Sequence, residues 1–182
     1  KKIFKNIDAK VNQASKDLAE ERGACPDAAE YGYQERFSNK TAIAPTASIS
    51  IICGGASPGV EPIAANSYTH KTLSGSFNVK NRYLEEILES HGKNDDETWS
   101  SITTNQGSIS HLDFLTDLEK DVFKTAFELN QNWIIELSGD RTPFISQAQS
   151  LNLFLPADVH KKELHKIHFD AWKKGLKSLY YC

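Results

Sequence analysis

The sequence lacks several features that define whole classes of protein. It contains no methionine among its 182 residues, and therefore no initiator, so we expect it to be part of a longer gene product. Its cysteines are Cys25, Cys53 and Cys182, an odd number without a CxxC pair. This usage argues against a disulfide scaffold and a zinc ribbon, and it predicts a reducing, cytoplasmic compartment.

Two further absences concern partners. No apolar run approaches the roughly 18 residues that a membrane-spanning helix needs, and no signal peptide opens the chain. There is no surplus of basic residues, because 21 lysines and arginines stand against 24 aspartates and glutamates. We therefore expect neither a membrane nor a nucleic acid as a partner. The 39% of hydrophobic residues are enough for one core, which favours a single domain.

Apolar residues recur at helical spacing in five stretches of the chain. We predict helices over residues 3–23, 81–91, 116–129, 130–138 and 158–175. Gly23 is the predicted C-cap of the first helix, Asn81 and Asp158 are predicted N-caps, and Gly139 is the expected break after the fourth helix. The expected apolar stripe of the first helix is Ile3, Ile7, Val11, Ala14 and Leu18.

Short apolar runs between these helices predict strands. The runs cover residues 41–44, 68–79, 151–155 and 176–181. The first ends at Pro45, and the second is broken around Ser74 and Gly75, while residues 24–39 and 93–97 are predicted as a loop and a polar turn. Helices that alternate with short buried strands are typical of βαβ units around a parallel sheet or barrel. We predict an α/β fold.

A run of small and hydroxylated residues follows the first predicted strand. It consists of Pro45, Thr46, Ala47, Ser48, Ile49 and Ser50. Such a turn can present backbone N–H groups and hydroxyls to an anion, particularly where a helix begins. It is also typical of a serine-rich turn with a helix N-cap, and no GxxxxGK[ST] spacing supports phosphate binding.

Histidines and lysines gather towards the end of the chain. His160, His165 and His168 fall on one predicted helix, but no carboxylate stands at the ExxH spacing of di-iron bundles, so we predict no metal site. The lysines of this region are Lys161, Lys162, Lys166, Lys173, Lys174 and Lys177. We interpret them as a solvated helix face, with docking of a partner as the alternative.

Tyr180 and Tyr181 are adjacent in the last predicted strand. Neighbouring residues of a strand point to opposite faces, so the pair can be one core and one surface residue. Tyrosine can also be oxidised by one electron when a neighbouring group takes its proton, so the pair could pass a radical along. The spacing alone leaves both interpretations open. No cysteine has a nearby histidine or a paired cysteine that would mark it as a nucleophile.

Six short motifs occur in a fixed order along the chain. They are Gly23-Ala24-Cys25-Pro26, Arg36-Phe37-Ser38-Asn39, Ala42 to Ser50, Glu61-Pro62, Ala148-Gln149-Ser150-Leu151-Asn152 and Gly175-Leu176-Lys177-Ser178-Leu179-Tyr180-Tyr181. With this ordered set, the sequence resembles the C-terminal part of the large (alpha) subunit of class I ribonucleotide reductase, of the bacterial and phage type. The resemblance extends from about Ile3 to Tyr181.

The resemblance implies a fold and a set of roles. The fold would be the later part of a ten-stranded α/β barrel, with residues 1–182 as a single, incomplete segment of the barrel domain. The run from Pro45 to Ser50 would hold the diphosphate of a ribonucleoside diphosphate substrate, and Tyr180 and Tyr181 would transfer the radical. The family reduces ribonucleotides to deoxyribonucleotides by radical chemistry.

The resemblance also implies partners. They are the N-terminal remainder of the alpha subunit, a second alpha subunit and a small beta subunit that generates the radical. The family further needs a metal-radical centre in that small subunit, a thiol reductant and nucleotide effectors, and we expect this segment to bind no cofactor itself.

The sequence departs from the family in what it omits. It has no Asn-x-Cys-x-Glu string for the thiyl cysteine, and no counterpart of the redox pair, the cysteine tail or the regulatory domain. A split gene, an intein beginning at Cys182 or a truncation would each produce such a chain. We expect the isolated segment to be inactive. It is either a portion of a working reductase or a non-catalytic remnant that binds phosphate or docks a subunit.

Overall fold

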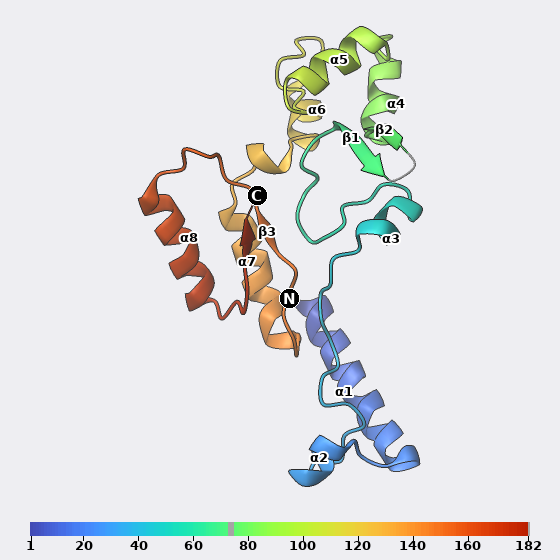
Figure 1. Ribbon diagram of the computed structural model, residues 1–182, viewed down its shortest axis with the longest axis vertical. Coiled ribbons are helices and arrows are strands. Elements are labelled where there is room, and N and C mark those ends of the chain that lie inside the picture. The colour runs from blue at the N-terminus through green and yellow to red at the C-terminus, as the bar shows by residue number, and fades with distance from the viewer. Residues whose placement is uncertain (73–74, 182) are drawn as a thin grey trace. The chain divides into compact units, whose positions relative to one another are not determined.

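The structure is a computed structural model that describes residues 1–72 and 75–181, without the side chains of residues 70, 72 and 181. The chain divides into two compact units, which are described separately (Figure 1). Unit 1 comprises Lys1–Pro45, Gln131–Leu153 and Ala157–Cys182, and unit 2 comprises Thr46–Asn130 and Phe154–Pro156. The prediction of one barrel-domain segment over residues 1–182 stays a prediction.

Unit 1 contains the predicted parallel strand pair. Its elements are α1 (Lys2–Arg22), α2 (Pro26–Glu30), α7 (Asn132–Arg141), the 3₁₀ helix η2 (Thr142–Phe144), β3 (Asn152–Leu153), α8 (Lys161–Lys173) and β4 (Tyr180–Tyr181). Strands β3 and β4 are parallel, with Asn152 opposite Tyr180, and α8 connects them. This strand, helix, strand unit confirms the predicted α/β arrangement.

A third extended segment joins these strands. Ile43 forms a parallel bridge with Gln149, and the amide of Ser150 donates to the carbonyl of Ile43 at 2.7 Å. On the other side, the amide of Tyr180 donates to the carbonyl of Leu151 at 2.8 Å. Residues 147–153 therefore run between the segment that ends at Pro45 and the segment that ends at the tyrosine pair.

Helix α1 confirms the predicted bounds but not the predicted buried face. Gly23 ends the helix with φ 84°, a conformation that favours glycine. The buried residues are Ser15 and Ala19, whereas Ile3 is 73% exposed. The polar loop that follows the helix explains this face, because the hydroxyl of Ser15 accepts a hydrogen bond from the amide of Arg36 at 3.1 Å.

Several other boundaries differ from the prediction. The predicted loop contains α2, and α5 (Asp96–Thr104) begins inside the predicted polar turn, with Asp95 as its N-cap. His160 caps α8 in place of Asp158. Gly139 lies within α7 and does not end it. The absence of a side chain there makes room for the stem of Lys174, which packs 2.9 Å from the position of a Cβ. The helix predicted over 116–129 is two shorter ones.

Unit 2 combines a hairpin with short helices. Its elements are α3 (Ala47–Ile52), β1 (Ser67–Thr72), β2 (Gly75–Lys80), α4 (Arg82–Ser90), α5, α6 (Asp117–Val122) and the 3₁₀ helix η1 (Ala126–Glu128). Strands β1 and β2 are antiparallel, which confirms two β pieces; Ser74, at the predicted break, lies outside the described residues. Asn81 caps α4 as predicted, by accepting from the amide of Tyr83. The core of the unit is Leu84, Leu88, Trp99, Ile102, Ile109, Leu112 and Leu115.

Buried polar groups hold the loops of unit 2. The side-chain amide of Asn66 donates to the carbonyls of Gly107 and Phe123 at 3.0 and 2.7 Å, and its oxygen accepts from the Asn81 side chain at 2.9 Å. Asn66 is 1% exposed, so every one of these bonds replaces a bond to water. This residue joins three segments of the unit.

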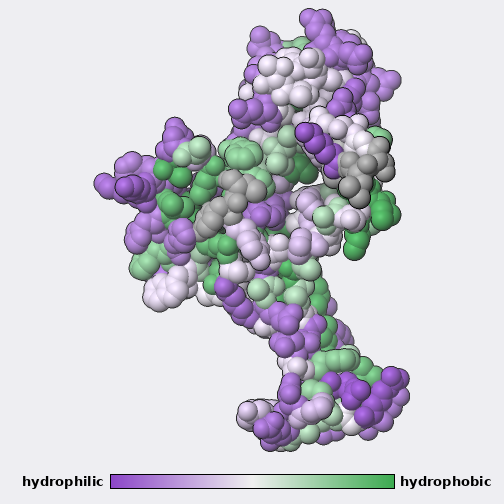
Figure 2. Space-filling model, viewed as in Figure 1, coloured by the Kyte–Doolittle hydropathy of each residue, from purple (hydrophilic) through white to green (hydrophobic). Residues whose placement is uncertain are grey.

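Some apolar residues remain on the surface. Figure 2 shows a hydrophobic patch over α3, where Ile49 and Ile52 are 60% and 83% exposed. In unit 1, Trp133 of α7 and Trp172 of α8 are also exposed. Among the described residues, no helix combines the length and apolar character needed to cross a membrane.

Candidate functional site

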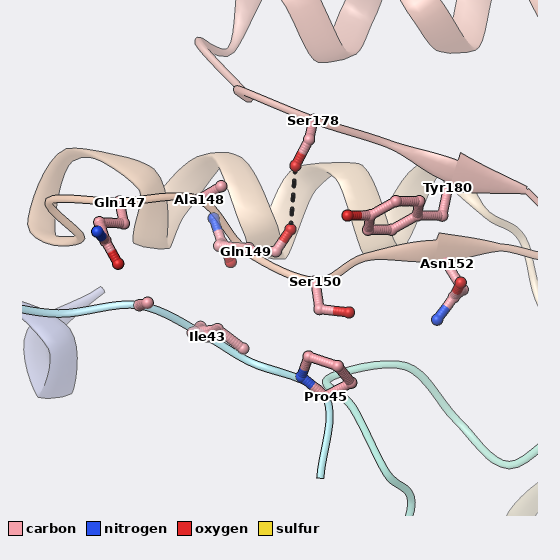
Figure 3. A pocket seen from close by; sticks show the side chains of 10 residues that line it. Ile43, Pro45, Gln147, Ala148, Gln149, Ser150, Asn152, Ser178 and Tyr180 are labelled. Atoms are coloured by element: carbon pink, nitrogen blue, oxygen red, sulfur yellow. Dashed lines mark hydrogen bonds between the residues drawn. The ribbon is translucent and has the colours of Figure 1, made fainter. Parts of the chain in front are cut away.

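The main cavity of unit 1 lies where three extended segments meet. It has a volume of about 640 Å³ (Figure 3). Its lining residues are Ala42, Ile43, Pro45, Gln147, Ala148, Gln149, Ser150, Asn152, Ser178 and Tyr180. More than half of them are polar, so the cavity can bind a hydrogen-bonding group as well as an apolar surface.

Gln149 fixes the central segment of this cavity from behind. Its side-chain amide donates to the carbonyl of Ser138 and to the hydroxyl of Thr142, both at 2.9 Å. Its side-chain oxygen accepts from Nε of Arg141 at 3.0 Å. Gln149 is only 7% exposed. Its side chain therefore holds the central segment in place, and its main chain borders the cavity.

Arg141 contributes a half-buried positive charge to this network. Burial lowers the pKa of Arg141, but a guanidinium remains protonated at neutral pH. A second bond from its guanidinium to the hydroxyl of Ser138, at 2.8 Å, ties the last turn of α7 to the same group. The central segment is therefore attached to α7 by one charge-assisted hydrogen bond, the stronger kind, from Arg141 to Gln149.

Tyr180 lies at the edge of the cavity. It is 54% exposed and belongs to β4, directly opposite Asn152 of β3. Figure 3 shows its ring alongside residues 149–152, with Ser150 and Asn152 on the neighbouring segment. The side chain of Tyr181 lies outside the described residues, so the transfer of a radical between the two tyrosines stays a prediction.

The run from Pro45 to Ser50 is divided between the units. Pro45 lines the cavity of unit 1, and α3 begins two residues later in unit 2. The hydroxyl of Thr46 donates to the carbonyl of Pro58 at 3.1 Å, and the buried hydroxyl of Ser50 donates to the carbonyl of Ala47 at 2.7 Å. The hydroxyls of Thr46 and Ser50 therefore bond within unit 2 and shape the turn.

Ser48 is an exposed hydroxylated residue of the same run. It lies in the first turn of α3, together with Ala47 and Ile49. The first amides of a helix have no partner within the helix, and they carry partial positive charge. The turn thus places these amides and the Ser48 hydroxyl in the first turn of a helix, and anion binding there stays a prediction.

Two histidines and two cysteines considered in the sequence lie in helices or at their ends. His160 caps α8 by accepting from the amide of Lys162 at 3.1 Å, and the ring of His165 stacks on that of Phe169. Within the described ranges, no three histidine, cysteine, aspartate or glutamate side chains gather as metal ligands. Cys25 is the N-cap of α2, Cys53 is exposed, and Cys182 lies outside the described residues.

The comparison that decides the family concerns most of the chain. The profile of the ribonucleotide reductase barrel domain matches residues 27–182. The chain belongs to this family. The expected α/β barrel segment is thereby confirmed, while the number of strands in the complete barrel stays as the resemblance implies.

Relatives support the same assignment to the ribonucleotide reductases. The chain is 49% identical to the ribonucleoside-diphosphate reductase large subunit of Invertebrate iridescent virus 6, over 98% of this chain and 19% of that protein. It is 40% identical to the alpha subunit from Chlamydia trachomatis, over 80% of this chain and 14% of the relative. The chain thus spans less than a third of the curated relatives it matches.

A solved reductase structure has the same fold. It is the Actinobacillus ureae class Id ribonucleotide reductase alpha subunit, with a TM-score of 0.83 and 37% sequence identity. The match covers 99% of this chain and 33% of the solved one. The fold of this solved alpha subunit therefore extends over nearly the whole of this chain.

Sequence reasoning assigned no role to several residues of the cavity. Gln149, Ser150, Asn152 and Ser178 lie within two of the motifs that carry the resemblance. Their common position around one cavity follows from the parallel pairing of β3 and β4 and from the bridge at Ile43. The order of the motifs was the signal that could have led to them.

Proposed function

We propose that this chain is a portion of a ribonucleoside-diphosphate reductase large subunit, which reduces ribonucleotides to deoxyribonucleotides by radical chemistry. One observation carries the proposal. Segments from three of the family motifs, ending at Pro45, Asn152 and Tyr180, border a single cavity although they are far apart in sequence. Family membership and the names of the relatives give the reaction class.

The proposed phosphate site is the turn from Pro45 to Ser50. The amides of Ala47, Ser48 and Ile49 would bind the diphosphate, and the hydroxyl of Ser48 would add a donor. In this proposal Thr46 and Ser50 hold the turn, and the amides and Ser48 bind the phosphate. The internal bonds of Thr46 and Ser50 support these roles, because a turn that is already fixed loses little entropy when the substrate binds.

The proposed radical path uses Tyr180 and Tyr181. When a phenol loses an electron it becomes strongly acidic, so its proton must pass to a neighbouring acceptor at hydrogen-bond distance. The electron then comes from the next residue of the path, and the proton returns in the reverse step. The position of Tyr180 beside residues of two other family motifs, at one cavity of unit 1, supports the proposal.

The proposal includes partners that supply what this chain omits. These are the rest of the large subunit with its thiyl cysteine, a second large subunit and a small metal-containing subunit that generates the radical. A thiol reductant, nucleotide effectors and a ribonucleoside diphosphate complete the reaction, and we place it in the cytoplasm. The segment by itself is proposed to be inactive.

The test is reconstitution of the complete enzyme. This chain, co-expressed with the missing N-terminal portion and supplied with the small subunit, should reduce ribonucleoside diphosphates, and omission of this chain should abolish the product. Substrate binding without turnover by the complete assembly would favour the alternative of a non-catalytic remnant. An assembly that neither bound nor reduced the substrate would refute both the reductase function and the phosphate-binding alternative.

A further inference from the structure

Lys177 lies three residues before Tyr180 and differs from a solvated lysine. Its ammonium group donates to the main-chain carbonyls of Ile145, Ser146 and Gln147, at 3.3, 2.7 and 2.9 Å. An ammonium group has three N–H donors, so these bonds use all of its donors. Lys177 is exposed, but it lies beyond the end of α8 and its ammonium group is bonded to these carbonyls, so it is not part of a solvated helix face.

The three carbonyls belong to a turn that is fixed from a second direction. The amide of Gln147 donates to the carbonyl of Thr41 at 2.9 Å, and the amide of Thr41 donates to the hydroxyl of Ser146 at 2.8 Å. Lys177 thus attaches the chain that leads into β4 to a rigid point, the beginning of the segment 147–153. Three carbonyl dipoles directed at one cation also make each bond stronger than a neutral one.

The strand that follows has few other constraints on its register. β3 and β4 are two residues long each. Besides this short ladder, the hydroxyl of Ser178 donates to the carbonyl of Gln149 at 3.3 Å (Figure 3). Because side chains alternate along a strand, a slip by one residue would move Tyr180 to the opposite face.

We propose that Lys177 is a positioning residue that sets the register of β4 and thereby keeps Tyr180 at the cavity. Its functional consequence rests on the proposed radical path, whereas the register can be measured without turnover. A slip of one residue moves a side chain by about 3.3 Å along the strand, which is more than proton transfer between neighbouring groups tolerates.

The first measurement is hydrogen exchange in the full-length large subunit that contains this segment. Lys177→Met keeps the aliphatic stem and removes the three donors, and Lys162→Met, at an exposed position in the first turn of α8, is the control. The amide of Tyr180 should exchange about tenfold faster or more in Lys177→Met. The amides of Ile167 and Ala171 in the core of α8 should be unaffected, as should all three in the control.

The second measurement is steady-state turnover with the small subunit present. Lys177→Met should lower kcat about tenfold or more while the KM for the ribonucleoside diphosphate stays within about twofold, and Lys162→Met should change neither. Exchange or kcat that stays at the wild-type value would overturn the proposal. So would equal acceleration at Ile167 and Ala171, which indicates general destabilisation. If Lys177→Met does not fold, Lys177→Gln is judged by the same criteria.

The two proposals fail in distinguishable ways. If Tyr180→Phe retained activity, the radical path would be refuted, and the exchange rate at Tyr180 would still report on the register. If Tyr180→Phe abolished turnover and Lys177→Met left the exchange unchanged, the radical path would stand and the positioning role would be refuted.

Discussion

Gln149 offers the sharpest test of how the cavity is held in place. Replacement by methionine preserves the approximate volume of the side chain but removes its three hydrogen bonds. The two neutral bonds, to Ser138 and Thr142, contribute about 1 kcal/mol each, and the bond from the charged Arg141 contributes about 2 kcal/mol. We therefore expect a loss of about 4 kcal/mol in the free energy of opening this part of unit 1.

Native-state hydrogen exchange in the full-length large subunit measures this loss directly. The reporter is the amide of Ser150, which donates to the carbonyl of Ile43 and is released only when the two segments separate. A loss of about 4 kcal/mol corresponds to exchange that is about a thousandfold faster. Gln147→Met is the matched control, because Gln147 borders the same cavity and is exposed. Acceleration below about tenfold in Gln149→Met, or equal acceleration in the control, would refute the anchoring role.

Four further predictions follow from described contacts. Ser48→Ala should raise the KM for substrate about tenfold, whereas Ser50→Ala, whose hydroxyl bonds within the turn, should raise it less; equal effects would contradict this division. Tyr180→Phe should abolish turnover in the assembled enzyme and leave substrate binding intact, as measured by ligand titration. The bonds from His91 and Thr116 lower the pKa of Glu119 to about 2. Their contribution to stability is therefore present above about pH 4.5 and is lost as the pH falls towards 2. Glu119→Gln should flatten this part of the curve of melting temperature against pH. Asn66→Ala should destabilise unit 2 by about 3 kcal/mol, as measured by hydrogen exchange of its core amides.

Local sequence patterns predicted several elements correctly. The hairpin, α4 with its Asn81 cap and the parallel unit around α8 all follow from apolar spacing and turn residues. Local patterns failed where contacts between distant residues decide. A glycine usually weakens a helix, but Gly139 lies inside α7, where Lys174 packs against it. The polar loop beside α1 likewise shifts the buried face to Ser15 and Ala19, while Val11 and Leu18 of the predicted stripe are half-buried.

The candidate site was predictable as a set of motifs but not as an arrangement. The motif order led to the hydroxylated turn and to the tyrosine pair, and it gave the family. It did not indicate which hydroxyls donate internally, because Thr46 and Ser50 bond to carbonyls whose position depends on the fold of the turn. The motif order also did not distinguish the role of Lys177 from that of the neighbouring lysines, because its three carbonyl partners lie 30 to 32 residues earlier in the chain.

The division of unit 1 into three stretches has a consequence for the order of folding. Most of unit 2 is one continuous stretch, Thr46–Asn130, which comes between the first and second stretches of unit 1 in the amino-acid sequence. The bond between Thr41 and Ser146 therefore closes a loop of 105 residues, whereas the hairpin of unit 2 closes within a few. Closing a long loop costs more entropy, and folding slows as contacting residues lie further apart in sequence. During synthesis, unit 2 can thus form while the ribosome is still producing the strands that unit 1 needs.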